Sequence, residues 1–168
     1  MELAAKEIQS SGGQGLGGKY LTFSLGTEEY GIVITKVREI IGIMEITAVP
    51  HTPEFIKGVI NLRGRVIPII ELRMKFGMEL KAYDDRTCII VVDVPGPNGM
   101  VQVGMLVDSV SEVVNIADQD IEPPPDFGTT TEADNIIGMG KIKGKLKILL
   151  DVDQVIGRTL ASSLSSLK

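Results

Sequence analysis

Short apolar runs separated by glycine and proline recur along the chain, and the clearest pair spans residues 56–72. This stretch reads IKGVINLRGRVIPIIEL, and its two arms, rich in β-branched residues, meet at Arg63 and Gly64. β-branched side chains fit a pleated, packed surface, and glycine permits the backbone of a tight turn. Pro68 cannot donate a ladder hydrogen bond, so the second arm must lie at a sheet edge or bulge there. The pattern predicts a β-hairpin.

The same pattern returns 80 residues later, where residues 136–152 read IIGMGKIKGKLKILLDV. Glycines, acidic residues and apolar positions of the two stretches match in one register, and residues 31–41 are echoed in the same way by residues 104–114. The chain is therefore predicted to be a duplication. A unit of about 65 residues would be marginally stable alone, so the two units are expected to share a core. The positions expected to be buried in that core are Ile60, Ile70, Leu106 and Leu150.

The rest of the pattern predicts more short strands and few helices. Further strands are expected at residues 20–25, 30–33, 40–46, 87–94, 100–107 and 113–116. Short helical turns are expected at 35–39, 72–77 and 108–112, a tight turn at 95–99, and a long surface loop at 117–134. Many short strands joined by Gly/Pro turns, with no helix long enough for repeated crossovers, predict an all-β fold of small barrels.

The duplication divides the chain into four parts. Residues 1–18 are expected to be a flexible N-terminal arm, because the SSGGQGLGG segment cannot bury enough surface to offset the entropy of ordering. Residues 19–83 form the first barrel repeat, residues 84–158 the second, and residues 159–168 a C-terminal tail. The arm spells GxGxxG, but it precedes a strand instead of following one, which argues against a dinucleotide site.

Composition limits the function further. The chain has 168 residues with 17 basic and 22 acidic side chains, a net charge of −5 that opposes general binding to nucleic acid or anionic lipid. It has no apolar run of about 20 residues that could span a membrane and no signal-peptide core. Its single cysteine excludes an internal disulfide, so a reducing, cytoplasmic location is expected.

Candidate chemistry is scarce. His51 is the only histidine, Cys88 the only cysteine, and no GxSxG motif is present, so neither a catalytic triad nor a structural zinc site is predicted, and no cofactor is expected. The acids at 84–85 and 118–122 are expected to serve turns and caps. Lys141, Lys143, Lys145 and Lys147 alternate with apolar residues, which predicts that most of them lie on one face of a hairpin and guard a sheet edge. Two alternative functions stay open. One is a barrel-type nucleic-acid binder, and the other is a small enzyme that uses this lysine hairpin or the loop acids.

Three segments of the chain resemble the CheW family of bacterial chemotaxis coupling proteins. They read FSLGTEEYGIVITKVREIIG, HTPEFIKGVINLRGRVIPIIELRMKFG and VGMLVDSVSEVV, and the resemblance extends from Tyr20 to Ile156. It implies two small five-stranded β-barrels, SH3-like or OB-like in topology, between which strands can be exchanged. It also implies a non-enzymatic adaptor that joins the cytoplasmic tips of methyl-accepting chemotaxis receptors to the regulatory domain of the histidine kinase CheA.

The resemblance also implies which residues make contacts. The expected receptor contacts are Val37, Glu39, Arg63, Cys88, Ile89 and Val113, and the expected kinase contacts are Ile34, Ile43 and Glu45. Arg63 stands at the hairpin bend, where a long side chain points out of the packed layers and is available for docking. Its guanidinium fork suits carboxylates or carbonyls on a helical receptor tip. Arg63 is therefore predicted to be a receptor contact and not a structural ion pair.

Overall fold

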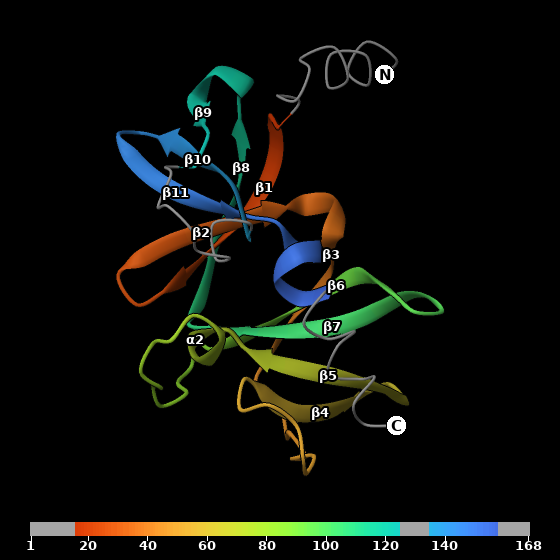
Figure 1. Ribbon diagram of the computed structural model, residues 1–168. Coiled ribbons are helices and arrows are strands. Elements are labelled where there is room, and N and C mark those ends of the chain that lie inside the picture. The colour runs from red at the N-terminus through yellow and green to blue at the C-terminus, as the bar shows by residue number, and fades with distance from the viewer. Residues whose placement is uncertain (1–15, 125–134, 158–168) are drawn as a thin grey trace.

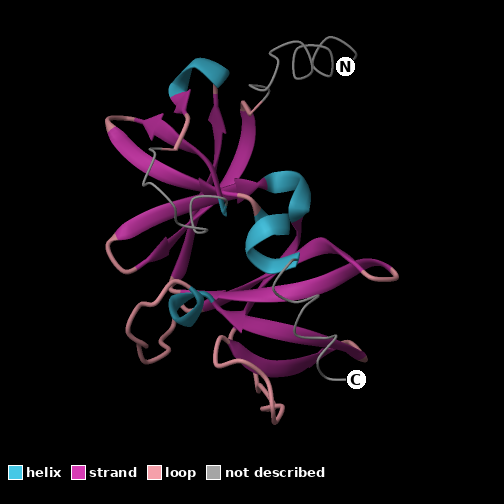
Figure 2. Ribbon diagram, viewed as in Figure 1, coloured by secondary structure: helices cyan, strands magenta, loops and turns pink. Residues whose placement is uncertain are grey.

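The computed structural model describes residues 16–124 and 135–157. The strands form two curled sheets, drawn one above the other in Figure 1, and the helical segments are all short (Figure 2). This confirms the predicted all-β fold. Most of the expected arm, all of the expected tail and the part of the expected loop at 125–134 lie outside the described residues.

One sheet has six strands. In spatial order they are β8 (Ser109–Ile116), β1 (Gly18–Leu25), β2 (Glu28–Val33), β11 (Lys145–Leu150), β10 (Ile136–Ile142) and β9 (Ile121–Glu122). The β2–β11 pair is parallel and every other pair is antiparallel. The family resemblance implied five strands in each unit. The sixth strand of this sheet is the two-residue strand β9, which falls in the expected loop.

The other sheet has five strands. They are β3 (Val37–Gly42), β6 (Cys88–Gly96), β7 (Gly99–Val107), β5 (Arg65–Glu71) and β4 (Ile56–Leu62). Here too one pair, β5–β7, is parallel. The short helical segments are η2 (Ile34–Lys36), α2 (Leu72–Lys75), η3 (Asp118–Asp120) and the π-helical turn η5 (Asp153–Gly157).

The two repeats exchange their first hairpins. The β1–β2 hairpin, from the first half of the sequence, lies between β8 and β11 of the second half, and the β6–β7 hairpin lies between β3 and β5 of the first half. The parallel pairs β2–β11 and β5–β7 are the equivalent contacts of the two copies. Each sheet therefore needs both halves of the chain.

The central strands of the five-stranded sheet, β5, β6 and β7, are buried on both faces, one facing the interior of their own curled sheet and the other the opposite sheet. In β6, Ile89 and Val91 pack inside the five-stranded sheet, whereas Ile90 and Val92 pack between the sheets. Burial on both faces explains why this strand reads as a continuous apolar run instead of an alternating one.

All four predicted core residues are buried, but they divide between two clusters. Ile70 and Leu150 lie in the large cluster between the sheets, together with Phe23 and with Val155 of η5. Ile60 and Leu106 lie in a separate cluster inside the five-stranded sheet. The expectation of one core that contains all four was therefore wrong, because each strand has two apolar faces.

A polar contact, which we call the crossover node, lies where the chain passes from β7 to β8. Arg73 of α2 donates two hydrogen bonds to Asp108, from Nε at 2.8 Å and from Nη2 at 2.5 Å. Asp108 also accepts a hydrogen bond from the backbone N–H of Gly26 at 2.8 Å, and its own N–H donates to the carbonyl of Ser24 at 3.1 Å. The node joins α2, which follows β5, to the β1–β2 turn of the other sheet.

Several predicted elements differ in the structure. The strand expected at 40–46 is β3 at Val37–Gly42, after which Thr47 exchanges two backbone hydrogen bonds with Val59. The helical turn expected at 108–112 is instead the start of β8, because the edge of β1 offers an open row of backbone partners and the hydroxyl of Thr22 donates to the carbonyl of Glu112 at 2.8 Å. Tertiary pairing overrides a local preference in both places.

The second arm of the hairpin was expected to lie at a sheet edge or to bulge at Pro68, and the structure agrees, because the backbone of Pro68 faces an unpaired part of the sheet. The β4–β5 hairpin closes on the pair Leu62–Arg65, so hydrogen-bonded pairs alternate along it and Pro68 occupies a position that points away from β4. The parallel ladder with β7 begins only at Ile69. The missing N–H therefore costs no ladder hydrogen bond.

Truncation of the inter-sheet core should destabilise both sheets. Leu150 is 3% exposed, and Leu150→Ala should lower the free energy of unfolding by about 2 to 5 kcal/mol, because it removes buried methyl groups and leaves a cavity. Leu146 lies on the same strand but is 53% exposed, so it is the matched control. Leu146→Ala should change the free energy of unfolding by less than about 0.5 kcal/mol. Urea unfolding of the two variants measures the difference, and equal losses would refute the core assignment.

Candidate functional site

The tip of the β4–β5 hairpin holds Arg63 in a fixed, outward position. Arg63 has φ of 53° and Gly64 has φ of 85°, the pair of left-handed residues typical of a two-residue type I′ turn. The side-chain oxygen of Asn61 accepts a hydrogen bond from the N–H of Gly64 at 2.8 Å and braces the turn. The second repeat has the same geometry at Lys143 and Gly144, with φ of 51° and 78°.

Arg63 makes an ion pair with Glu39 of β3, which the sequence did not predict. The side chains are 67% and 33% exposed, so the pair lies at the surface. Exposed ion pairs contribute only about 0 to 1 kcal/mol to stability. The prediction that Arg63 is not part of an ion pair therefore needs correction: Arg63 is paired with Glu39, and this exposed pair contributes little to stability.

Five of the six expected receptor contacts lie on the five-stranded sheet, but they do not form one continuous patch, because Val37 and Cys88 pack towards the inter-sheet core and Ile89 packs on the other side. Val37 and Glu39 lie on β3, which pairs with β6, and the register places Cys88 opposite Gly42. Cys88 is half-buried, and its thiol donates to the carbonyl of Arg86 at 3.0 Å. Val113 is exposed but lies on β8 of the six-stranded sheet, apart from the others.

Ile89 is the expected contact that the structure places least favourably. Its side chain is fully buried inside the five-stranded sheet, where it packs in the same cluster as Val91 and Leu106. In this conformation Ile89 supports the surface from below and does not reach a partner. Sequence position alone could not reveal this, because adjacent residues of β6 point to opposite faces and both faces are apolar.

The expected kinase contacts lie at both ends of β3. Ile43 and Glu45 are exposed in the segment that follows the strand, whereas Ile34 is half-buried in η2 before it and packs against the inter-sheet core. Ile40, which the sequence analysis did not single out, is 43% exposed on the same edge strand. The alternation of β3 was the available signal, because Ile40 must point to the face opposite Glu39.

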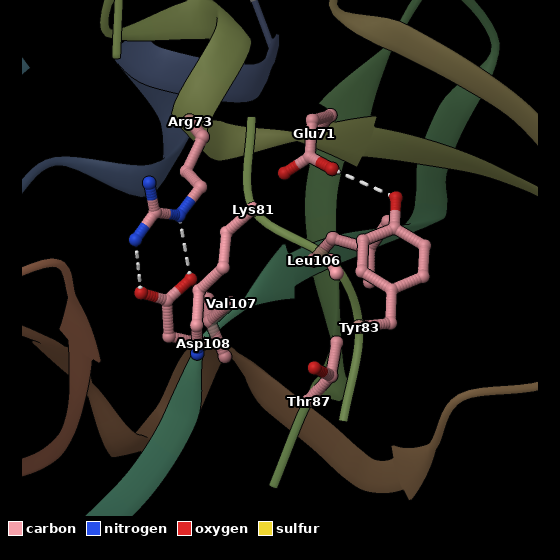
Figure 3. Close-up of a pocket in the computed structure, with 9 residues that line it drawn as sticks. Glu71, Arg73, Lys81, Tyr83, Thr87, Leu106, Val107 and Asp108 are labelled. Carbon is pink, nitrogen blue, oxygen red and sulfur yellow. Dashed lines mark hydrogen bonds and ion pairs between the residues drawn. The ribbon is translucent and has the colours of Figure 1, made fainter. Parts of the chain in front are cut away.

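A second polar cluster lies beside the crossover node, and it is filled rather than open. Figure 3 shows Arg73 facing Asp108, and the hydroxyl of Tyr83 directed at the carboxylate of Glu71, to which it donates at 2.8 Å. The remaining cavity is only about 10 Å³, room for about one water molecule. Burial and the neighbouring Glu71 carboxylate raise the pKa of Tyr83 above its usual value. Arg73 and Asp108 form an ion pair, and the Tyr83 hydroxyl satisfies the Glu71 carboxylate, so the cluster serves as a set of structural contacts.

The other candidate residues make hydrogen bonds or ion pairs within the protein. The Oδ1 atom of Asp84 accepts a hydrogen bond from the N–H of Arg86 at 2.8 Å, as expected of a turn acid. Lys147 is buried against Glu29 and Lys141 pairs with Glu122. The prediction that most of the four lysines lie on one face is wrong: Lys145 and Lys147 share a face of the hairpin, Lys141 lies on the opposite face and Lys143 lies in the turn.

Within residues 16–124 and 135–157, no three His, Cys, Asp or Glu side chains are grouped so as to hold a metal ion. In the same ranges no helix is both long and apolar enough to cross a membrane. The most distinctive surface is therefore the edge formed by β3, the start of β6 and the Arg63 hairpin tip.

The fold and this surface define a β-rich interaction module that presents a charged hairpin tip beside an exposed edge strand. Residues 19–159 match the family model of the CheW-like domain. The chain belongs to this family. It is a non-enzymatic scaffold or adaptor of chemotaxis, of the kind that couples receptors to the kinase CheA.

Individual relatives agree with this assignment. The chain is 40% identical to the chemotaxis protein CheW of Klebsiella aerogenes over 149 residues, which cover 89% of this chain and 87% of the relative. It is 37% identical to the chemotaxis protein CheW of Rhizobium meliloti, covering 92% and 94%. The crystal structure of the scaffolding protein TtCheW from Thermoanaerobacter tengcongensis superposes with a TM-score of 0.74 at 36% identity, covering 83% of this chain and 92% of the other.

The crossover node should make stability depend on pH. The two hydrogen bonds from Arg73, and then the N–H of Gly26, hold the pKa of Asp108 below its usual value. Because the folded pKa lies below the unfolded value of about 3.9, this stabilisation is present above about pH 4 and is lost as the pH falls towards the folded pKa.

The comparison of wild type with Asp108→Asn isolates this effect. Near neutral pH the variant should be less stable by about 1.5 to 3 kcal/mol, the contribution of a hydrogen bond to a charged group. The difference should shrink between about pH 5 and pH 2, as measured by urea unfolding at each pH. A difference that stays constant down to pH 2 would mean that the Asp108 carboxylate does not titrate as described.

Proposed function

We propose that the surface built by β3, the start of β6 and the Arg63 hairpin tip binds the cytoplasmic tip of methyl-accepting chemotaxis receptors. The observation that carries this proposal is the exposed Arg63–Glu39 ion pair at the centre of that surface. It presents a cation and an anion side by side on a rigid turn, and a receptor helix can replace either partner with its own charge. Val113, on the other sheet, would mark the far margin of the contact.

We further propose that the regulatory domain of CheA binds the segment that follows β3. Ile43 and Glu45 are exposed there, next to the receptor surface but not part of it. Ile34 would act indirectly, because its packing against the inter-sheet core fixes the start of β3. Two adjacent, non-overlapping surfaces allow one molecule to hold the receptor and the kinase at once, in a cytoplasmic location at receptor clusters.

The Arg63→Ala variant tests the receptor surface. Loss of a hydrogen bond to a charged group should weaken binding of a receptor cytoplasmic fragment by roughly tenfold to a hundredfold, as measured by isothermal titration calorimetry. The melting temperature should hardly change, because an exposed ion pair contributes little. Binding of CheA should also be retained.

The second repeat supplies a matched control for this experiment. Lys143→Ala removes an exposed cation at the equivalent left-handed position of the other type I′ turn. It should leave receptor binding unchanged. Equal losses from Arg63→Ala and Lys143→Ala would point to general charge attraction, and unchanged binding in Arg63→Ala would place the receptor contact elsewhere.

A further inference from the structure

The two hairpins of the five-stranded sheet separate towards their tips and leave an open groove. The parallel ladder between β5 and β7 extends only from the pair Ile69–Gly104 to the pair Glu71–Leu106. Beyond it lies a groove of about 430 Å³, lined by residues 65–68 of β5, residues 100–102 of β7 and Val59 of β4. None of the receptor or kinase contacts considered above lines it.

The β7 wall of the groove exposes backbone groups suited to another strand. The β6–β7 hairpin closes on the pair Gly96–Gly99, so alternate pairs along it are hydrogen-bonded. Met100 and Gln102 fall on the other pairs and direct their N–H and C=O groups away from β6, into the groove. Among the described residues neither makes a backbone hydrogen bond on that side.

Neighbouring strand edges are closed to such pairing, which makes the β7 edge distinctive. On β6 the residue opposite Met100 is Pro95, which has no N–H to offer to an added strand. On β5 the groove wall includes Pro68, and on β4 the edge at Val59 is covered by Thr47. Within residues 16–124 and 135–157, no segment pairs with the groove side of Met100 or Gln102.

The side chains that line the groove are mostly apolar, and the polar ones are Gln102 and the cation Arg65. Val66 of β5 is 70% exposed and Met100 of β7 is 60% exposed, and the register places their side chains on opposite faces of the sheet at the two walls of the groove. Arg65, at the end of β5, is exposed and forms no ion pair with any residue in the described ranges. Contiguous exposed apolar surface beside unpaired backbone is typical of sites that bind another protein segment.

We propose that this groove binds an extended segment of a partner protein, which adds a strand to β7. The segment pairs with the backbone of Met100 and Gln102, packs side chains against Val66 on one face of the sheet and against Met100 on the other, and places a carboxylate near Arg65. This site goes beyond the receptor and kinase contacts proposed above, and it can fail or succeed independently of them because its test uses neither partner.

The test is a titration of the ¹⁵N-labelled full chain with the synthetic peptide acetyl-Glu-Val-Thr-Val-Thr-Val-Glu-amide. An affinity of about 0.1 mM would slow hydrogen exchange of the Met100 and Gln102 amides about tenfold at about 1 mM peptide. A peptide with lysine in place of glutamate should bind about threefold more weakly, because it loses the ion pair with Arg65. A peptide that is N-methylated at its central residues lacks the backbone N–H donors needed for strand pairing. It should not slow hydrogen exchange of the Met100 and Gln102 amides.

Two protein variants at repeat-related positions complete the test. Val66→Asp, which puts a charge on the groove wall, should reduce peptide binding at least about tenfold. Leu146→Asp, at the counterpart of Val66 in the second repeat, should leave binding unchanged. No slowing at the Met100 and Gln102 amides, equal binding of the N-methylated peptide, or equal losses in the two variants would each overturn the proposal.

Discussion

The reciprocal exchange of the first hairpins is the constraint on which the rest of the structure depends. The β1–β2 hairpin completes the sheet of the second repeat, and the β6–β7 hairpin completes the sheet of the first. Neither sheet can form from one repeat alone without leaving open strand edges. Asp108 stands at the point where the chain passes from one sheet to the other, and its hydrogen bonds with Arg73 and Gly26 hold both sheets to that crossing.

The same exchange also creates the candidate functional surface. Strand β6 belongs to the second repeat in sequence but lies against β3 of the first, so Cys88 is brought opposite Gly42. The β4–β5 hairpin then closes the other side, and Arg63 reaches Glu39 across the sheet. This surface is drawn from three sequence-distant segments, which are held in place by ladder hydrogen bonds and, at the hairpin tip, by the hydrogen bond from Gly64 to Asn61. Rigid presentation is what an adaptor needs if it is to hold two partners in a fixed relative position.

The sequence predicted the features that local patterns determine. The β4–β5 hairpin followed from its β-branched arms and from glycine at the bend, and the unusual place of Pro68 followed from its missing N–H. The duplication was predicted because matched glycines recur in one register, and the two hairpin tips have left-handed residues at equivalent positions.

The features that the sequence did not predict are those set by pairing across the sheets. The Arg63–Glu39 pair joins a residue of the β4–β5 turn to a residue of β3, 24 positions earlier, and no spacing rule connects them. Strand β8 replaced an expected helical turn because β1 offered it an open edge. Ile89 was expected at a surface and is buried, because a strand with two apolar faces gives no sign of which side faces solvent.

If the exchanged hairpins make the two sheets interdependent, the sheets must unfold together. Differential scanning calorimetry of the full chain measures this most directly, because it compares the calorimetric enthalpy of unfolding with the van't Hoff enthalpy obtained from the shape of the transition. The account predicts one transition in which the two enthalpies are equal. Two resolved transitions, or a calorimetric enthalpy about twice the van't Hoff value, would show that the sheets unfold as independent units and would contradict it.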